Sequence, residues 1–418
     1  MRLRFNKHIL VFGIFGEYIF FTILMLLGLQ YINSNDSNIY HLYWLIICIF
    51  VAIKIVQLMC GSNKFKIKLF IGILFILFLF ILIFGFAWIL HSSEITLKYT
   101  LVFLALCLPS FLIGIISSNY KYRIEIGKMI INFIPVGTLA LLINAIRMID
   151  YQYMASAGGL SRLSAGYMAV QLFSVTLCVY IGKKDLLNII LPRYLNNKFR
   201  NYILLLMLIT QFIIILFSAS RGPIVALFFI IFSEILLFGQ IDKAKKLKYI
   251  LFSIILVIIF FIIVFKSNFN AFNASIVRIK TLFDPSSSID VSNGRLDLYR
   301  KSLEMFVEKP ILGQGPLGFL NKSGFNIYPH NLILEILCDY GILGFSIWAI
   351  LFLYIIRKYI KNLRFDGTVN IIFSVFMVKL VEHTFSGSFI LSGQFWFFVG
   401  FGIFLPNVKD KILLKSNR

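Results

Sequence analysis

Long apolar runs alternate with short polar segments along most of this chain. Twelve runs, all rich in Ile, Leu and Phe, reach about the 20 residues that a helix needs to cross a bilayer. In lipid, a helix of this length satisfies its own backbone hydrogen bonds. The pattern therefore predicts an all-α polytopic membrane protein of about 12 transmembrane helices. The expected spans are 9–29, 42–60, 69–90, 99–117, 129–149, 165–182, 202–219, 223–239, 249–265, 331–356, 369–385 and 389–405.

The segment between the ninth and tenth runs has the composition of a soluble protein. It contains an amphipathic stretch from Arg295 to Val307 and two turns that carry proline. A loop of this length usually has a function, and we expect a short helix here that lies over the membrane surface. The predicted division is a nine-helix region (1–265), a large exofacial loop (266–329), three C-terminal helices (330–405) and a cytoplasmic tail (406–418).

Composition and charge support this layout. Hydrophobic residues make up 60% of the chain and charged residues only 14%, which excludes a soluble globular or disordered protein. The net charge of +22 is a topology signal, because 26 of the 40 Lys and Arg residues lie in alternate polar segments. Both termini are then cytoplasmic, and no nucleic-acid partner is expected. The first apolar run has no small-residue cleavage site, so it is interpreted as an uncleaved helix.

No motif for a cofactor or metal is found. The five cysteines lie in or beside apolar runs without CxxC spacing, and Asp284, Asp290 and Asp297 do not match a calcium-loop pattern. Phosphate-binding loops, zinc-protease motifs, nucleophile elbows and DxD motifs are also absent from the sequence. We therefore expect no metal and no cofactor, and no use of cytoplasmic ATP or a nucleotide sugar.

The predicted exterior side is poor in positive charge, so its few arginines stand out. Arg221 precedes Gly222 and Pro223 at a turn between two apolar helices, where it either snorkels to the interface or is aimed into a polar cavity. Arg162, in another exterior loop, is either a solvated charge or a substrate contact. Arg295 opens the amphipathic stretch, where a solvated helix face is the alternative to a functional role.

His330 stands directly after a proline, where the loop ends and the next long helix begins. The positive end of the helix dipole disfavours its proton, so a neutral imidazole able to accept a proton is expected. A plain interfacial histidine is the alternative.

Two further sets of ionisable residues occur within the predicted spans. Lys379, Glu382 and His383 share one helix face, either as a functional group or as a structural Lys–Glu pair. Glu335 and Asp339 share a face of the helix that follows His330.

Several of these segments together resemble the bacterial O-antigen polymerase and ligase family. The resemblance covers about 125 residues and includes the Ser-Arg-Gly at Arg221. Gln314, Pro316 and Asp339 depart from the family's usual residues. The matching segments are Gly294-Arg295, Lys309-Pro310-Ile311-Leu312-Gly313-Gln314-Gly315-Pro316, Pro329-His330-Asn331 and Asp339-Tyr340-Gly341-Ile342-Leu343-Gly344.

The resemblance implies a metal-independent, inverting GT-C-type glycosyltransferase of the bacterial plasma (inner) membrane with an exofacial active site. Its donor is a glycan on undecaprenyl pyrophosphate, and its partners are a glycan acceptor, membrane lipids, and a chain-length regulator and flippase. The catalytic roles carry over to Arg221, Arg295 and His330. The expected substrate-binding residues are Arg162, Tyr328, Asn331, Asp339 and Glu382, and Tyr151 and Tyr153 are further candidates for stacking on sugar rings.

Three functions remain open at this point. A polymerase would transfer the glycan to the next lipid-linked repeat unit, whereas a ligase would transfer it to the lipid A core, and the shared motifs do not separate them. We favour the polymerase because its acceptor uses the same lipid carrier as its donor. A flippase should show repeated halves, but the large loop before residue 331 has no counterpart in the first half of the chain.

Overall fold

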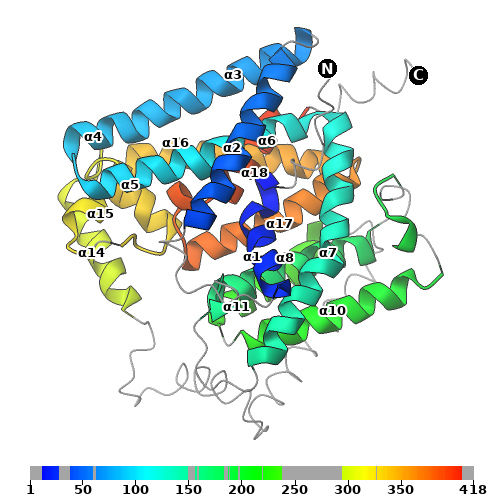
Figure 1. Cartoon of the computed structure of the whole chain (residues 1–418). Helices are drawn as coiled ribbons and strands as arrows, with labels where there is room; N and C mark the ends of the chain where they lie inside the picture. The colour runs from blue at the N-terminus through cyan, green and yellow to red at the C-terminus, as the bar shows by residue number, and fades with distance from the viewer. Residues whose placement is uncertain are drawn as a thin grey trace, which may run out of the picture.

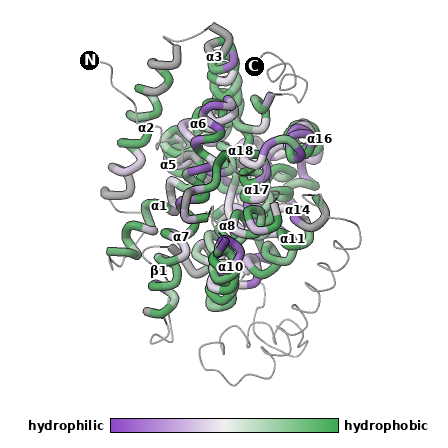
Figure 2. The backbone as a smooth tube through the Cα atoms, turned by 90° about the vertical axis from the view of Figure 1, so that its right-hand side faces the viewer, coloured by the Kyte–Doolittle hydropathy of each residue, from purple (hydrophilic) through white to green (hydrophobic). Residues whose placement is uncertain are grey.

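The chain folds as a bundle of helices (Figure 1). The structure is a computed structural model that describes residues 12–27, 38–59, 63–148, 156–157, 160–182, 187, 189–195, 198–218, 220–237, 294–325 and 327–406. Figure 2 shows that apolar residues extend along most of these helices. The helices are α1 (Phe12–Leu26), α2 (Asn38–Met59), α3 (Asn63–Phe80), α4 (Phe86–Leu90), α5 (Glu94–Val102), α6 (Leu108–Ser118), α7 (Tyr120–Met148), α8 (Arg162–Ile181), α10 (Arg200–Phe217), α11 (Arg221–Leu237), α14 (Arg295–Glu308), α15 (Gly318–Lys322), α16 (Leu332–Leu363), α17 (Gly367–Phe385) and α18 (Gly393–Phe404).

Several short elements complete the description. One π-helical turn (Ile81–Gly85) joins α3 to α4, and another (Phe103–Cys107) joins α5 to α6, so each pair forms one long apolar rod. A two-residue antiparallel pair, β1 (Ser156–Ala157) and β2 (Leu160–Ser161), precedes α8. The 3₁₀ turn Phe389–Leu391 precedes α18, and another, Arg193–Leu195, precedes α10.

The predicted membrane spans correspond largely to helices. Seven helical segments of the described chain have the length and apolar composition to cross a membrane, and α1, α2 and α18 contain shorter apolar segments. The expected span 249–265 lies outside the described residues, so the count of 12 stays a prediction. The seven segments are Ile67–Leu90, Glu94–Ser118, Tyr120–Ile146, Leu163–Ile181, Arg200–Phe217, Leu332–Leu363 and Gly367–Phe385.

The buried centre is aromatic and closely packed. Helix α18 lies against α6, because Gly114 and Gly400 have no side chain to hold the two backbones apart. A β-carbon at Gly114 would lie 2.8 Å from the Phe401 backbone nitrogen. Trp396, fully buried between these helices, donates a 2.9 Å hydrogen bond from Nε1 to the Phe389 carbonyl.

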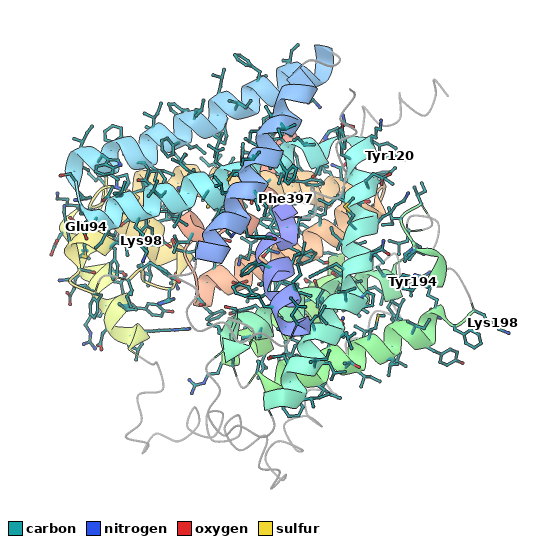
Figure 3. All side chains as sticks on the ribbon, viewed as in Figure 1. Glu94, Lys98, Tyr120, Tyr194, Lys198 and Phe397 are labelled. Atoms are coloured by element: carbon teal, nitrogen blue, oxygen red, sulfur yellow. The ribbon has the colours of Figure 1, made fainter. Side chains whose placement is uncertain are left out.

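Several helices end together at one end of the molecule, which we call the loop end. The charge pattern assigned these helix ends to the exterior side of the membrane. The loop end is defined by the turn at residues 91–93, the segment 309–322 and the end of α17 at Phe385. Ser93 Oγ donates a 2.6 Å hydrogen bond to Asn321 Oδ1 there. In Figure 3, Glu94 and Lys98 lie at this edge, whereas Tyr120 and Lys198 lie at the opposite edge.

At the opposite end of the molecule, Arg123 has a structural role in addition to its part in the charge pattern that sets the membrane orientation. Arg123, one of the charges counted in the predicted cytoplasmic segments, is 1% exposed, and its Nε lies 2.8 Å from Asp366 Oδ2. Asp366 also caps α17, accepting hydrogen bonds from the Thr368 and Val369 amides. This pair therefore fixes the start of α7 against the start of α17.

Candidate functional site

Two of the matched segments form one interlocked structure at the loop end. The turn between α14 and α15 and the first half of α16 are joined by four backbone hydrogen bonds of 2.8–3.3 Å. We call this structure the motif interlock. Its hydrogen bonds run from the Gln314 amide to the Cys338 carbonyl, Gly315 to Asp339, Ile342 to Pro310, and Leu343 to Ile311.

Glycines make this close approach possible. Gly341 interrupts α16 with φ 62° and ψ −166°, a conformation that is almost exclusive to glycine. A β-carbon at Gly341 would lie 2.7 Å from the Gly313 nitrogen, and one at Gly313 would lie 2.5 Å from the Asp339 carbonyl carbon. Both backbones would have to separate to admit either side chain. The glycines of the two motifs are thus explained by packing.

Asp339, expected to bind substrate, is held inside the motif interlock. It is 2% exposed, and its Oδ1 accepts a 2.9 Å hydrogen bond from the Phe319 amide and also interacts with the amides of Leu317 and Gly318. Asp339 thereby holds the start of α15 against α16. This placement gives its carboxylate a structural task that the sequence did not indicate.

His330 is placed between the loop and α16 in an unusual backbone conformation. Its φ is +57°, in the left-handed region that residues other than glycine seldom adopt. Burial, and then the charge of Arg295, lower the pKa of His330 to about 4, so the imidazole is neutral near pH 7. The neutral form was expected from the helix dipole, but burial is the larger cause. The Tyr328 ring packs against it, with ring centroids 4.4 Å apart.

Asn331 caps the helix that follows. Its Oδ1 accepts hydrogen bonds of 3.0 and 3.1 Å from the amides of Ile333 and Leu334. A substrate-binding role therefore stays a prediction for Asn331, and its observed task is to start α16. His330 precedes this cap, so it is positioned by a fixed helix start.

Arg295 connects α14 to the end of α17. Gly294, with φ 76°, starts the helix, and the Arg295 Nη1 donates a 2.6 Å hydrogen bond to the Phe385 carbonyl. The guanidinium interacts electrostatically with both His330 and the Tyr167 hydroxyl. Arg295, on α14, therefore bonds to the end of α17 and interacts with Tyr167 of α8 and with His330, which precedes α16.

The residue after Arg221, Gly222, packs against Tyr167, the tyrosine that interacts with Arg295. Arg221 is the first residue of α11, and a β-carbon at Gly222 would overlap the Tyr167 hydroxyl. Gly166, one residue before Tyr167, packs on Ser218 and Pro223 at the same turn. The Ser-Arg-Gly segment and the start of α8 therefore lie in direct contact.

Glu382 joins this group from α17. Its Oε1 lies 2.8 Å from Lys379 Nζ, so the predicted pair at one helix face is observed, and Glu382 also interacts electrostatically with Tyr167. The buried carboxylate of Glu335 accepts a hydrogen bond from Ser388. His383 is 1% exposed and packs edge-on against Phe395.

Unpartnered polar atoms gather around Arg295. Within the described part of the chain, Tyr167 Oη, Glu382 Oε2 and His330 Nδ1 are buried and have no hydrogen-bond partner. Buried polar atoms are almost always paired in folded proteins, so a group of unpaired ones indicates a place where a ligand completes the bonding. We call Arg221, Arg295, His330, Tyr167 and Glu382 the candidate site.

The side chain of Arg162, which was also expected at this site, lies outside the described part of the structure. Arg162 is the first residue of α8, one and a half turns before Tyr167. Tyr151 and Tyr153 lie outside the described residues. Tyr167 was not among the residues predicted from the sequence, where it is one aromatic residue of an expected membrane span.

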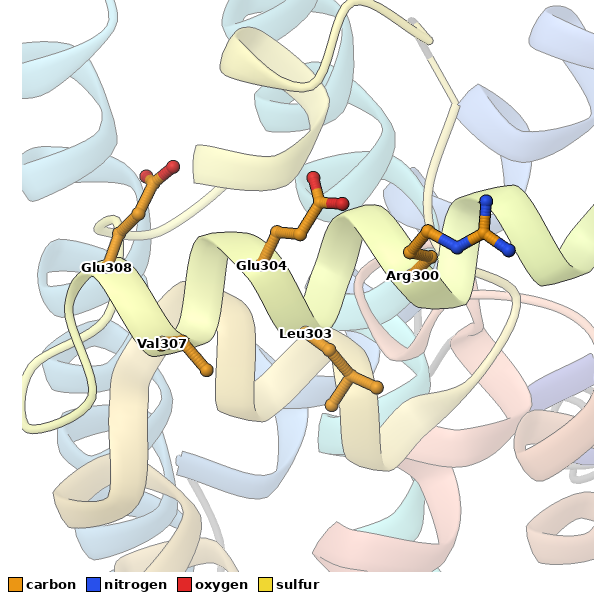
Figure 4. Close-up of a pocket in the computed structure, with 5 residues that line it drawn as sticks. All are labelled: Arg300, Leu303, Glu304, Val307 and Glu308. Atoms are coloured by element: carbon orange, nitrogen blue, oxygen red, sulfur yellow. The ribbon is translucent and has the colours of Figure 1, made fainter.

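A separate hollow follows one side of α14 (Figure 4). It has a volume of about 510 Å³ and is lined by Arg300, Leu303, Glu304, Val307 and Glu308. None of the candidate-site residues lines it. No group of three or more His, Cys, Asp or Glu residues that could hold a metal occurs within the described ranges.

Comparison with known protein families gives a match for part of the chain. Residues 204–349, about a third of the chain, match the family described as O-antigen ligase. No curated protein matches the chain. The match confirms the resemblance inferred from the motifs, and it spans Arg221, Arg295 and His330.

Proposed function

Because residues 204–349 match the O-antigen ligase family, we propose that this chain is a polymerase of surface polysaccharide. It transfers a growing glycan from undecaprenyl pyrophosphate to the next lipid-linked repeat unit at the outer face of the bacterial plasma membrane. One observation carries the proposal: Arg295 interacts electrostatically with both His330 and Tyr167, Gly222 beside Arg221 packs on the Tyr167 hydroxyl, and Tyr167 Oη and His330 Nδ1 are buried without a partner.

The arginines have the chemistry to bind the donor. A lipid pyrophosphate is a good leaving group, so its departure depends on neutralising charge more than on a general acid. The guanidinium group is permanently charged and offers several donors in one plane, and its effect is larger where water is excluded. Within the described part of the chain, the Phe385 carbonyl is the hydrogen-bond acceptor of Arg295, through Nη1, and we propose that the other guanidinium nitrogen atoms bind the pyrophosphate.

His330 suits the role of base. With a pKa of about 4 it is neutral at physiological pH, and its buried Nδ1 has no described partner. Nδ1 can accept the proton of the acceptor sugar hydroxyl as that oxygen attacks the anomeric carbon. The carbon–oxygen bond to pyrophosphate breaks on the opposite face, so the product has inverted configuration, and no covalent enzyme intermediate or metal is required.

Among the three carboxylates considered from sequence, Glu382 is the best candidate to assist. Asp339 is bonded to backbone amides. Glu335 and Glu382 each have one bonded oxygen and one buried oxygen without a partner, but Glu382 is the one that interacts electrostatically with Tyr167 in the candidate site. We propose that Glu382 orients a sugar hydroxyl. Its Oε1 is paired with Lys379 Nζ at 2.8 Å, so Oε2 is the oxygen that accepts a hydrogen bond from the sugar.

A ligase is the second candidate, favoured by the description of the matched family itself. Deletion of the gene separates the two, because the polysaccharide of the mutant cell is visible on a gel. Loss of the polymerase should leave lipid A core with a single repeat unit. Loss of a ligase should leave bare core, with polymer retained on the lipid carrier, and an unchanged pattern would contradict both.

The site assignment is tested by complementing that deletion with single variants. Arg221→Ala, Arg295→Ala and His330→Ala should each abolish long chains at normal expression. Arg300→Ala is the matched control, because this arginine is exposed on the same helix as Arg295, and it should retain wild-type chains. Long chains in all three site variants would overturn the assignment.

A further inference from the structure

We propose that the hydroxyl of Tyr167 is a further substrate-binding group, which donates a hydrogen bond to an anionic oxygen of the lipid pyrophosphate beside Arg295. This inference rests on the proposed function. It adds to the two arginines a neutral donor from α8, a helix that precedes the matched segment of residues 204–349.

The burial of Tyr167 is the first observation. The residue is 1% exposed, and Oη has no hydrogen-bond partner among the described residues. A buried tyrosine hydroxyl usually finds a partner, and leaving it unpaired costs free energy. By contrast, the equally buried Tyr359 donates a 3.2 Å hydrogen bond to the Phe398 carbonyl. The Tyr167 hydroxyl therefore points to a partner that is bound from outside the protein.

The neighbours of Tyr167 define the chemistry of that partner. Arg295 and Glu382 both act electrostatically on the hydroxyl, and Lys379 is paired with Glu382. Lys379 offsets the charge of Glu382, so Arg295 leaves the group with a net positive charge and a bound cation is disfavoured here. A group that accepts hydrogen bonds from both a guanidinium and a hydroxyl is an oxyanion, and the oxygen atoms of a pyrophosphate meet this requirement.

Gly222 fixes where the hydroxyl lies. A β-carbon at this position would overlap Tyr167 Oη and would lie 3.0 Å from Cζ, so any larger residue must displace the ring. Because Gly222 has no side chain, the Tyr167 hydroxyl has room to lie against the backbone of the residue that follows Arg221. This gives Gly222 a positioning role that acts through Tyr167.

The experiment measures binding of undecaprenyl pyrophosphate to the full-length protein in lipid nanodiscs, with undecaprenol as the uncharged reference. Tyr167→Phe should weaken binding about tenfold, because it removes one hydrogen bond to a charged group. Tyr359→Phe is the matched control. It also removes one buried hydroxyl, but far from the candidate site in the sequence and on another helix, and it should bind as the wild type does.

Two additional variants separate the possible failures. Arg295→Ala should weaken binding; if it does so while Tyr167→Phe binds as tightly as wild type, the Tyr167 inference is overturned and the proposed function stands. If the wild type does not prefer undecaprenyl pyrophosphate to undecaprenol, the proposed function fails, and the inference with it. Should Tyr167→Phe fold poorly, Gly222→Ala displaces the hydroxyl while keeping the ring, and wild-type affinity in that variant refutes the inference.

Discussion

Gly341→Ala tests whether the motif interlock stabilises the protein. Gly341 has φ 62° and ψ −166°, and forcing a residue with a side chain into that region costs about 1–3 kcal/mol. The new methyl group would also overlap the Ile311 carbonyl and lie 2.7 Å from the Gly313 nitrogen. Because both are backbone atoms, the two segments must separate.

Separation breaks hydrogen bonds that join α16 to the turn after α14. Four such bonds are present, and each contributes about 1 kcal/mol net. Loss of two of them, added to the conformational cost, lowers the free energy of unfolding by about 3–5 kcal/mol. Because His330 begins the segment that leads into the interlock, glycan transfer should be lost as well.

Gly324→Ala is the control variant, because it introduces the same kind of backbone strain but no overlap with neighbouring atoms. Gly324 also has a positive φ, 82°, but no atom lies within 4 Å of the position of its β-carbon. Its replacement should cost about 1–2 kcal/mol. Both variants are unfolded in mixed micelles by titration with a denaturing detergent, and the free energies are compared. Equal losses in the two variants would refute the packing argument for the interlock.

Three further predictions concern individual side chains. Arg295→Lys keeps the charge but removes the planar set of donors, so the transfer rate should fall at least about tenfold, and an unchanged rate would contradict its role as a bidentate donor. Since the pKa of His330 is about 4 and only the neutral imidazole accepts a proton, activity should stay level from pH 7.5 to 5.5 and decline near pH 4; a decline centred at pH 6.5 would contradict the burial argument. Asp366→Asn retains the helix cap but leaves buried Arg123 without its counter-ion, so the free energy of unfolding should fall by about 3–5 kcal/mol, compared with less than about 1 kcal/mol for Glu304→Gln in an exposed pair.

The sequence alone predicted the features that depend on local composition. Apolar runs such as 69–90 and 99–117 became helices at the expected places, because the thickness of a bilayer and the needs of the backbone leave few alternatives. The helix starts after His330 and at Arg295 were also found, since proline, asparagine and glycine mark such boundaries locally. The motif residues matched a family for the same reason, because they lie in short continuous segments.

The sequence did not indicate what those residues contact. Asp339 was expected to face substrate, but its carboxylate holds the start of α15, and Arg123 was counted as a loop charge although it is buried against Asp366. Tyr167 was not considered at all. Each of these tasks is set by a contact between helices that are distant in the chain, and neither helical periodicity nor net charge carries information about such contacts.

The sequence by itself thus determined the class of protein, the alternation of its polar segments and the residues with suitable chemistry. Only the tertiary structure decided which of them are neighbours: Gly222, beside Arg221, packs on the unpaired Tyr167 hydroxyl of α8, and Arg295, bonded to the Phe385 carbonyl, interacts electrostatically with both Tyr167 and His330. The physical reason is that hydrophobicity fixes where each helix runs through lipid, whereas the close packing of small residues such as Gly166 and Gly222 fixes which helix faces adjoin.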